Sequence, residues 1–423
     1  MSRETELESV LQWLFADSMP KQVEEKARLL LLDTLGCVLA ASPKPRLRAF
    51  AARLAASDPG PVRVPGFTDS FSVTSAAALF CAAACWDEAC EGLARAHGRP
   101  GVAVIASCLS LAQVRPQCLQ EVLDAIATGY ETGGRLGEAV RMGPGMHVDA
   151  TWPGFGVAAA VVRLSRGSVN EALAAVRTAA CQMPHSLYLA AKAGAEARNT
   201  YLGHSAQLGL LAANAALAGC TAPEGALEEI GAGVIARPGE WFVLEGYLKP
   251  YAAVRHVHYG VAAALALRPK LANRLHDITR IELSTYAEAL TYCGNRAPRT
   301  AIQAQFSLSY GVACALATGE LGPASYDSGM LENGNIRELE RKIVLSGHPD
   351  LKTPARRGAT LVVELDGEKL EQTVARVAGD PGQPMTREQV LEKFTRYTGF
   401  APLRAEKILD GDGAQSLAEV IPL

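Results

Sequence analysis

The feature that most constrains the fold is a series of alanine-rich segments that are apolar on almost every side. Residues 72–85 and 102–113 contain no charged side chain, so as helices they would have no face suited to water. Comparable helical patterns with small residues recur farther along, at residues 119–137, 156–164, 169–181 and 205–218. Such helices need neighbours on all sides, and small side chains let those neighbours approach closely. The sequence therefore predicts a buried helical bundle in the first part of the chain.

The pattern changes after about Leu267. Residues 277–285 alternate apolar and polar side chains, as a half-buried strand does. Two further stretches of this kind flank Asp366-Gly367 within residues 360–375, which is a strong β-hairpin signal. Helical patterns at 303–318 and 336–345 lie between them. We therefore expect a mainly α protein, with a large all-helical domain over residues 1–266 and a smaller α+β domain with an antiparallel sheet from residue 267.

Composition and charge exclude several classes of protein. The net charge of -3, without a run of like charges, argues against a nucleic-acid partner, because phosphate binding requires a basic surface. No segment reaches the roughly 18 to 20 uninterrupted apolar residues of a membrane span. The ten cysteines form no C-x-x-C pair, and the polar first residues do not resemble a signal peptide. We expect a cytoplasmic protein with buried, reduced thiols, no structural metal and no membrane partner.

A basic stretch lies between the two predicted parts, from Lys249 to His258. Four of its ten side chains are cationic or can become so: Lys249, Arg255, His256 and His258. One interpretation is a cleft at a domain seam that binds anions and moves protons. The other is a solvated basic turn that leads into a helix.

Other candidate functional residues are scattered along the chain. His97 and His147 lie in loops rich in glycine and proline, where groups that act on substrates concentrate. Asp87 follows an apolar helix, at the end where the helix dipole disfavours a carboxylate. Lys192 and Arg198 are either a solvated helix face or ligands of a substrate carboxylate, for which arginine is the better choice.

Several catalytic motifs are absent from the sequence. It has no phosphate-binding glycine loop after a strand, no G-x-S-x-G and no H-E-x-x-H. The remaining histidines, lysines, tyrosines and carboxylates are the groups that acid/base catalysis uses. We therefore expect chemistry without a cofactor.

Taken together, several stretches resemble the MmgE/PrpD family, which includes 2-methylcitrate dehydratase, cis-aconitate decarboxylase and iminodisuccinate epimerase. The resemblance extends over nearly the whole chain. The matching stretches are Leu31–Gly36, Asp87 with His97, Ala127–Glu131 with Arg135–Gly137, His147 with Thr151 and Gly154–Gly156, Arg198–Gly209, Lys249–Tyr251 with His258, Ala304–Tyr310 and Gly379–Met385.

This resemblance implies a homodimer whose helical domain is completed by about residues 400–423, with residues 267–399 inserted as an α+β lid. It also implies a metal-free cleft between the domains. The positions that match functional residues of the family are Asp87, His97, His147, Lys249, His258 and Tyr310. Arg198 stands where several members carry lysine, and Asp87 is followed by Glu88-Ala89 where the family has a different pattern.

The resemblance and the residues together favour a cofactor-independent lyase that acts on a small di- or tricarboxylate. We expect dehydration of a 2-methylcitrate-like hydroxy acid, with His97 or His147 as the base and Asp87 orienting it. Arg198, Lys249 and His258 would stabilise an enediolate-like charge, Lys192 would bind a carboxylate, and Tyr310 would protonate the leaving hydroxyl. Epimerisation of an iminodisuccinate-like acid and decarboxylation of a cis-aconitate-like acid are alternatives, as is a non-catalytic homologue that binds carboxylates.

Overall fold

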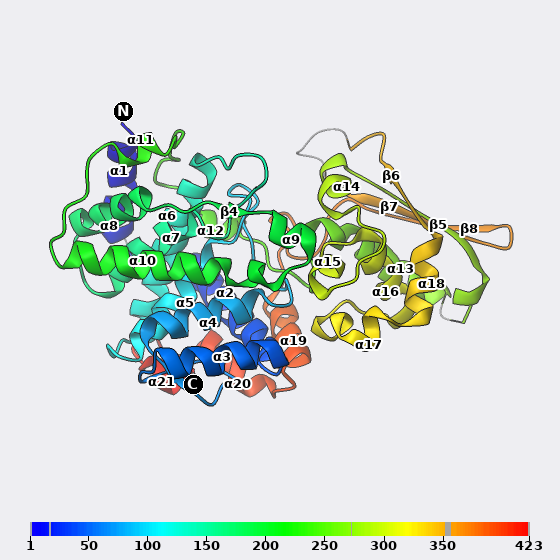
Figure 1. Ribbon diagram of the computed structural model, residues 1–423, viewed down its shortest axis with the longest axis horizontal. Coiled ribbons are helices and arrows are strands. Elements are labelled where there is room, and N and C mark those ends of the chain that lie inside the picture. Colours follow the sequence, from blue (N-terminus) through cyan, green and yellow to red (C-terminus); the bar gives the residue numbers. More distant parts are fainter. Residues whose placement is uncertain (1, 17, 272, 352–356, 422–423) are drawn as a thin grey trace.

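The computed structural model describes residues 2–16, 18–271, 273–351 and 357–421. A larger helical part and a smaller α+β part lie side by side along the long axis of the molecule (Figure 1). The fold class is therefore the predicted one: mainly α, with a smaller α+β part.

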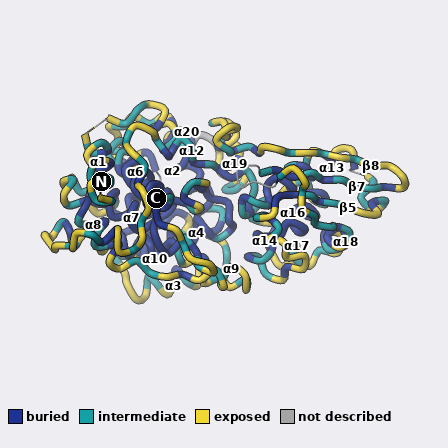
Figure 2. The backbone as a smooth tube through the Cα atoms, turned by 90° about the horizontal axis from the view of Figure 1, so that it is seen from above, coloured by how far each residue is buried: buried dark blue, intermediate teal, exposed yellow. Residues whose placement is uncertain are grey.

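The helical part is built around the apolar segments that the sequence indicated. Every residue of α5 is buried, and α5 packs against α4, α6 and α7. Buried stretches are concentrated in these central helices (Figure 2), yet no helix in the described part of the chain is long and apolar enough to cross a membrane. The helices are α1 (Arg3–Ala16), α2 (Lys21–Ala41), α3 (Pro45–Ser57), α4 (Val73–Cys85), α5 (Pro100–Ala112), α6 (Leu119–Ala139), α7 (Pro153–Leu164), α8 (Val169–Cys181), α9 (Leu189–Ala193), α10 (Tyr201–Leu217), α11 (Ala226–Glu229) and α12 (Phe242–Glu245), with two short strand pairs, β1 (Val62–Arg63) with β2 (Ser70–Phe71) and β3 (Met146–His147) with β4 (Ser186–Leu187).

Close approach of the helices depends on glycine where α6 crosses α7. A Cβ atom on Gly156 would lie 2.4 Å from the carbonyl oxygen of Gly129, and a Cβ on Gly129 would lie 2.7 Å from that of Gly156. Neither distance leaves room for a side chain. The prediction that small residues allow close helix packing is confirmed at this crossing.

The α+β part contains a four-stranded sheet in the order β6-β5-β7-β8. The predicted hairpin is present as β7 (Ala359–Leu365) and β8 (Glu368–Val374), and β5 (Ile278–Thr285) pairs antiparallel with β7. The fourth strand, β6 (Ile343–Gly347), pairs parallel with β5, so the sheet is mixed rather than wholly antiparallel. The helix predicted to reach residue 345 ends at Lys342. The helices of this part are α13 (His258–Leu271), α14 (Ala287–Cys293), α15 (Ala301–Gln305), α16 (Leu308–Thr318), α17 (Ser328–Leu331) and α18 (Gly334–Lys342).

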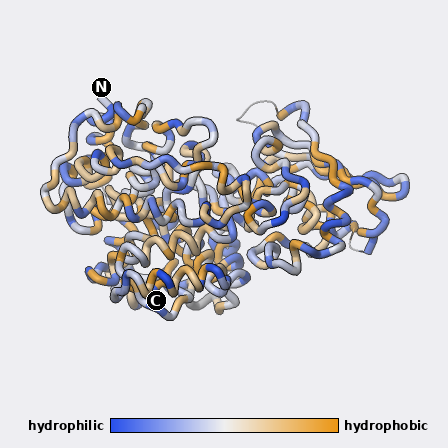
Figure 3. Tube along the Cα trace, viewed as in Figure 1, coloured by the Kyte–Doolittle hydropathy of each residue, from blue (hydrophilic) through white to orange (hydrophobic). Residues whose placement is uncertain are grey.

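Hydropathy follows this arrangement. Hydrophobic residues run along the helices of the bundle and along the strands, whereas hydrophilic residues gather at the outer tip of the β7–β8 hairpin (Figure 3). Along β7, buried and half-buried residues alternate, as expected for a strand with one face on a core. α13 covers that face by packing against β7 and β8.

After the sheet the chain returns to the helical part through α19 (Arg387–Thr398), α20 (Pro402–Asp410) and α21 (Leu417–Val420). Both α19 and α20 pack against α2. The Lys393 ammonium of α19 lies 2.6 Å from the Asp33 carboxylate of α2, and both groups are buried. The proposed domain limits, residues 1–266 with 400–423 and residues 267–399, stay a prediction.

The two passages of the chain between the parts run in contact with each other, at Leu248–Arg255 on the way out and Val377–Asp380 on the way back. We call this pair of segments the neck. The Arg255 guanidinium forms an ion pair with Asp380 and donates a hydrogen bond of 3.3 Å to the Ala378 carbonyl. Gly379 has φ of +91°, and a Cβ atom there would lie only 1.9 Å from the Leu248 carbonyl oxygen.

Candidate active site

A cavity of about 590 Å³ opens between the helical part and the α+β part. The loops that follow α4 and α6 line it from the helical part, and Lys249 and Arg255 line it from the neck, with His256 directly after them. The α+β part contributes Glu288, Tyr292 and Arg357. The predicted cleft at the seam is therefore present, and the stretch from Lys249 to His258 forms part of its wall rather than a solvated turn.

A buried cluster of charges lies at the inner wall of the cavity; we call its members Glu88, Arg99, Asp149, Arg198 and Lys249 the Glu88 cluster. All of them except Arg198 line the cavity directly. Glu88 accepts a hydrogen bond of 2.6 Å from Lys249, lies 3.2 Å from Arg99 and forms an ion pair with Arg198. Arg99 also lies 3.2 Å from Asp149. Three cations thus face two carboxylates, which leaves one positive charge in excess among these five residues. The Cys90 sulfur, which accepts a hydrogen bond from Arg99, is the neighbouring group that can reduce this excess. A buried uncompensated charge is unfavourable, so the cluster favours a bound anion.

Glu88 reaches these cations because of an uncommon backbone conformation just after α4. Its φ is +54°, in the left-handed region that a residue with a side chain adopts only at a cost. The turn separates Glu88 from its neighbour Asp87. The Asp87 carboxylate is buried outside the cavity lining, with the Lys44 ammonium 3.9 Å away, and burial raises its pKa to about 7.

Lys249 is the one cation of the Glu88 cluster that can give up its proton near neutral pH. Burial lowers its pKa to about 7, and the positive charges of Arg99 and Arg198 act in the same direction. A guanidinium keeps its proton under these conditions. Lys249 also donates a hydrogen bond of 3.0 Å to the Glu88 backbone carbonyl, which fixes its ammonium at the cavity wall.

Two of the histidines singled out in the sequence line the cavity. His97 is exposed to the cavity and has φ of +52°, and its ring makes no hydrogen bond with any described residue. His147 is buried, and its Nδ1 accepts a hydrogen bond of 3.2 Å from the Asp149 backbone N–H. This contact assigns the proton of the neutral ring to Nε2. Burial lowers the pKa of both rings, so both are neutral at pH 7.

The third histidine of the cavity is His256, which the sequence did not distinguish from its neighbours. Its Nδ1 lies 2.6 Å from the Tyr286 hydroxyl, and burial lowers its pKa to about 3. The candidate in this stretch was His258, which is fully buried and absent from the cavity lining. Its Nε2 lies 3.0 Å from the Ala253 carbonyl oxygen, so His258 holds the backbone of the neck.

The other residues predicted for the site are not brought together in the cavity. Lys192 is exposed on α9. Tyr310 is buried in α16 and donates a hydrogen bond of 2.6 Å to the Ser325 carbonyl. Arg198 faces the site only through Glu88, and Asp87 lies outside the lining.

Many polar residues of the cavity wall were not among the predicted site residues, including Glu88, Arg99, Asp149, His256 and Arg357. Arg99 and Asp149 each lie two residues after a candidate histidine, so proximity to His97 and His147 was an available signal. Nothing local in the sequence marks Arg357, which reaches the cavity through the fold. Among the described residues, no group of three or more His, Cys, Asp or Glu side chains is arranged to hold a metal ion.

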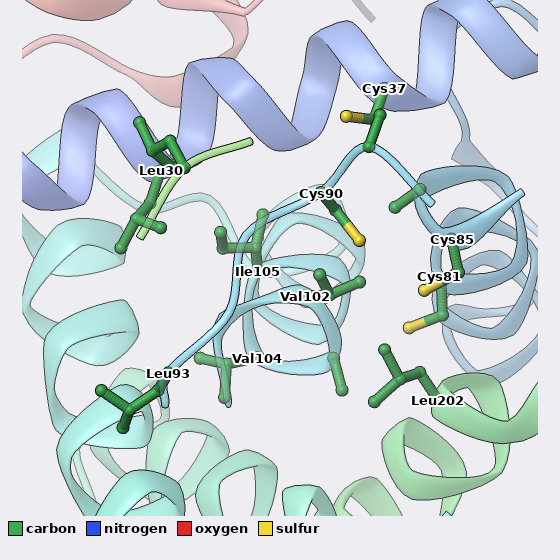
Figure 4. Close-up of a cluster of buried hydrophobic side chains, with 14 of the residues drawn as sticks. Leu30, Cys37, Cys81, Cys85, Cys90, Leu93, Val102, Val104, Ile105 and Leu202 are labelled. Carbon is green, nitrogen blue, oxygen red and sulfur yellow. The ribbon is translucent and has the colours of Figure 1, made fainter. Parts of the chain in front are cut away.

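Buried thiols lie directly behind the Glu88 cluster. Cys81 and Cys85 of α4 and Cys90 of the following loop belong to one apolar cluster (Figure 4). Arg99 donates a hydrogen bond of 3.2 Å to the Cys90 sulfur. The hydrogen bond with Cys85 and the charge of Arg99 lower the pKa of Cys90 to about 5, against the effect of burial. The prediction of buried thiols is confirmed for these three cysteines, but it is wrong for Cys181 and Cys220, which are exposed.

This arrangement combines neutral imidazoles with a partly charged lysine next to a binding place for an anion. Such groups transfer protons at neutral pH. Their position beside uncompensated positive charge allows them to stabilise negative charge that develops on a bound molecule.

The chain is similar to known proteins over most of its length. Residues 6–237 match the MmgE/PrpD N-terminal domain, and residues 251–411 match the MmgE/PrpD C-terminal domain. Two proteins named cis-aconitate decarboxylase, both from Aspergillus terreus, are 24% identical to this chain over 432 residues. That alignment covers 91% of this chain and 87% of each relative. The chain belongs to the MmgE/PrpD family.

Proposed function

We propose that the protein is a lyase-type enzyme that carries out acid/base chemistry on a small di- or tricarboxylate in this cavity. The observation that carries the proposal is the Glu88 cluster, whose excess positive charge adjoins His97 and His147. A carboxylate bound at Lys249 would supply the missing counter-charge. It would also hold the adjacent carbon within reach of the two imidazoles.

In this proposal His97 is the base, because its ring is neutral and has no hydrogen-bond partner among the described residues. It removes a proton from the carbon α to the bound carboxylate. The Nε2–H of His147 donates a hydrogen bond to the enediolate-like oxygen, and Lys249 neutralises its charge. In a dehydration the C–O bond to the β-hydroxyl then breaks, and the Lys249 ammonium gives that oxygen a proton, so that water leaves. Lys249 suits this step better than Tyr310, whose hydroxyl is committed to Ser325.

Dehydration of a hydroxy acid is our first candidate, and decarboxylation is the second. The relatives named cis-aconitate decarboxylase, which align with 91% of the chain, favour the second. A decarboxylation would begin without proton removal: the C–C bond to a carboxylate breaks, carbon dioxide leaves, and the bonding electron pair stays on the substrate carbon skeleton. An imidazolium that has taken its proton from solvent would then protonate the carbon that receives this electron pair. Epimerisation would share the first proton transfer of the dehydration.

The test is proton exchange in deuterated water. We expect the protein to incorporate deuterium into, or convert, at least one acid from a set of hydroxy-di- and tricarboxylates and cis-unsaturated tricarboxylates, followed by NMR. Product masses separate loss of water from loss of carbon dioxide. Replacing His97 or His147 with Ala should lower the rate by roughly a hundredfold or more, the usual scale of general acid/base catalysis.

His204 provides a matched control, since it is exposed on α10 and lies outside the cavity lining. His204→Ala should keep the wild-type rate. A rate within about threefold of wild type in both His97→Ala and His147→Ala would contradict the assignment. Binding of the acids without exchange or turnover would instead indicate a carboxylate-binding protein.

The proposal also includes a homodimer that needs no metal, as the family resemblance implies. A location in the cytoplasm and the absence of an organic cofactor complete it, as the sequence predicts. Sedimentation equilibrium measures the first point. Exchange activity that survives dialysis against a chelator supports the absence of a metal, and loss of activity with recovery on adding a divalent ion contradicts it.

A further inference from the structure

Two arginines line the cavity at positions away from the Glu88 cluster, and each comes from a different part of the molecule. Arg141 is exposed in the loop after α6, and Arg357 is half-buried just before β7. Both belong to the wall of the same cavity as His97. The helical part and the α+β part therefore each contribute one guanidinium to it.

These two guanidinium groups differ from the other cations of the wall in having little or no counter-charge. Among the described residues, Arg141 forms no hydrogen bond and no ion pair. Arg357 has one ion-pair partner among the described residues, the Glu288 carboxylate at 3.5 Å, and both side chains of that pair are partly exposed. Its guanidinium also lies 5.9 Å from the centre of the Tyr286 ring, which carries no charge to neutralise it. By contrast, Arg255 is bound to Asp380, and Arg99 and Lys249 are bound to Glu88. Partly exposed ion pairs are weak, so Glu288 leaves Arg357 available.

His97 connects the two charged regions. Apart from burial, the charges of Arg141 and Arg357 lower its pKa and the charge of Glu288 raises it, so all three lie within electrostatic reach of the ring. Arg357 acts in the same way on His256. A molecule held by the Glu88 cluster and touching His97 would therefore extend toward these guanidinium groups.

We propose that Arg141 and Arg357 bind a second carboxylate of the substrate and so make the site selective for di- and tricarboxylates over monocarboxylates. This inference rests on the proposed function for the location of the first carboxylate. Guanidinium groups suit the role because they bind carboxylate oxygens through two parallel N–H donors. Placing one on each part means that a bound dicarboxylate bridges the cavity.

The experiment measures binding of three simple acids by calorimetry: propionate, succinate and propane-1,2,3-tricarboxylate. The variants are Arg141→Gln, Arg357→Gln and, as a matched control, Arg53→Gln, since Arg53 is exposed on α3 outside the cavity lining. We expect each cavity variant to weaken succinate and tricarboxylate binding by about tenfold or more, the effect of losing a charge-assisted hydrogen bond. Propionate binding should change by less than about twofold, because propionate engages only the Glu88 cluster.

Three outcomes would overturn the inference: unchanged selectivity in both cavity variants, an equal loss for propionate, or a wild-type protein that does not prefer succinate to propionate. The result is separable from the proposed function. If the variants lose binding selectivity but the wild type exchanges no proton with any acid, this inference is supported. The proposed lyase function is then contradicted. Conversely, the wild type could turn over its substrate while both variants keep the wild-type ratio of kcat/KM values for di- and monocarboxylates. That result would contradict this inference and leave the proposed function intact.

Discussion

Asp87 and Glu88 are neighbours in the chain, but their carboxylates lie in very different surroundings. Glu88 is bound by three cations of the Glu88 cluster. Asp87 has only the Lys44 ammonium at 3.9 Å, and its Oδ2 has no hydrogen-bond partner among the described residues. The positive φ of Glu88 is what separates them. A proton on Asp87 compensates for the missing partners.

The pH dependence of stability should reveal this proton. Burial raises the pKa of Asp87 from 3.8 to about 7, so between these values the folded protein binds a proton that the unfolded chain releases. Asp87 therefore reduces stability as the pH rises through this window, and the full cost is present above pH 7. We expect Asp87→Asn to gain roughly 1 to 4 kcal/mol relative to wild type between pH 4 and pH 8. Urea unfolding at the two pH values measures this gain, and a difference that does not change with pH would contradict the assignment.

At the scale of single residues, the sequence located the loops of the site better than the side chains that point into it. His97, His147 and Lys249 line the cavity as expected. His258 and His256 lie two positions apart in one basic stretch. Which of the two lines the cavity depends on how η2 (Arg255–Val257) turns the chain into α13. That turn is set by tertiary contacts, which no local pattern encodes.

At the scale of elements, the α6–α7 crossing shows why the first part of the chain is rich in small residues. Gly129 and Gly156 allow the two backbones to touch, and both helices contribute to the core behind the site. The loop that carries Arg141 and His147 joins α6 to α7. Packing at this point therefore positions part of the cavity wall.

Replacing Gly156 with Ala should be destabilising, because the added Cβ would lie 2.4 Å from a backbone oxygen that cannot move independently. We expect a loss of about 1 to 3 kcal/mol, the usual cost of overpacking a core. Gly334→Ala is the matched control, since a Cβ at the start of α18 meets no atom within 4 Å. It should range from neutral to about 1 kcal/mol more stable, because alanine favours helix. Thermal or urea unfolding of both variants tests this, and equal effects would refute the steric explanation.

The type of an element was predictable where a periodic pattern extends over many residues. The exception is the short stretch Ile343–Leu345. The apolar segments became α4 to α8 and α10, and the alternating stretches became β5, β7 and β8. Ile343–Leu345 follows a helix directly, and three apolar residues continue a helical pattern as well as they begin a strand. They form β6 because the edge of β5 offers a parallel partner. Pairing between distant segments, rather than local preference, decided this element.

At the scale of the whole molecule, the neck determines how the two parts face each other. Lys249 and Arg255 lie on it, so the inner wall of the cavity belongs to the same segments that connect the parts. The sequence placed a site at this seam, but it could not show that Val377–Asp380 returns beside Leu248–Arg255. Residues more than a hundred positions apart meet there, and no motif signals that contact.

Gly379→Ala should therefore affect both stability and catalysis. Its φ of +91° and the 1.9 Å approach to the Leu248 oxygen require the neck to open. We expect a loss of about 2 kcal/mol or more, together with reduced turnover, because Lys249 follows Leu248 directly. Gly399→Ala is the control: its φ of +70° carries the backbone strain, but no atom lies within 4 Å of the added Cβ. It should cost about 1 kcal/mol and leave kcat unchanged. Similar losses of kcat in both variants would show that the neck contact does not matter for activity.

The paired passages of the neck also have a consequence for how such a protein changes over evolution. The chain enters and leaves the α+β part at one place. The α+β part is therefore an insertion whose two ends lie side by side, and the helical part packs together on its own. Insertions or deletions within the α+β part alter the outer wall of the cavity, where Arg357 lies, while α2 and α19 keep their contact. New substrates can therefore be selected by remodelling one side of the site, with the lysine on the opposite side inherited unchanged.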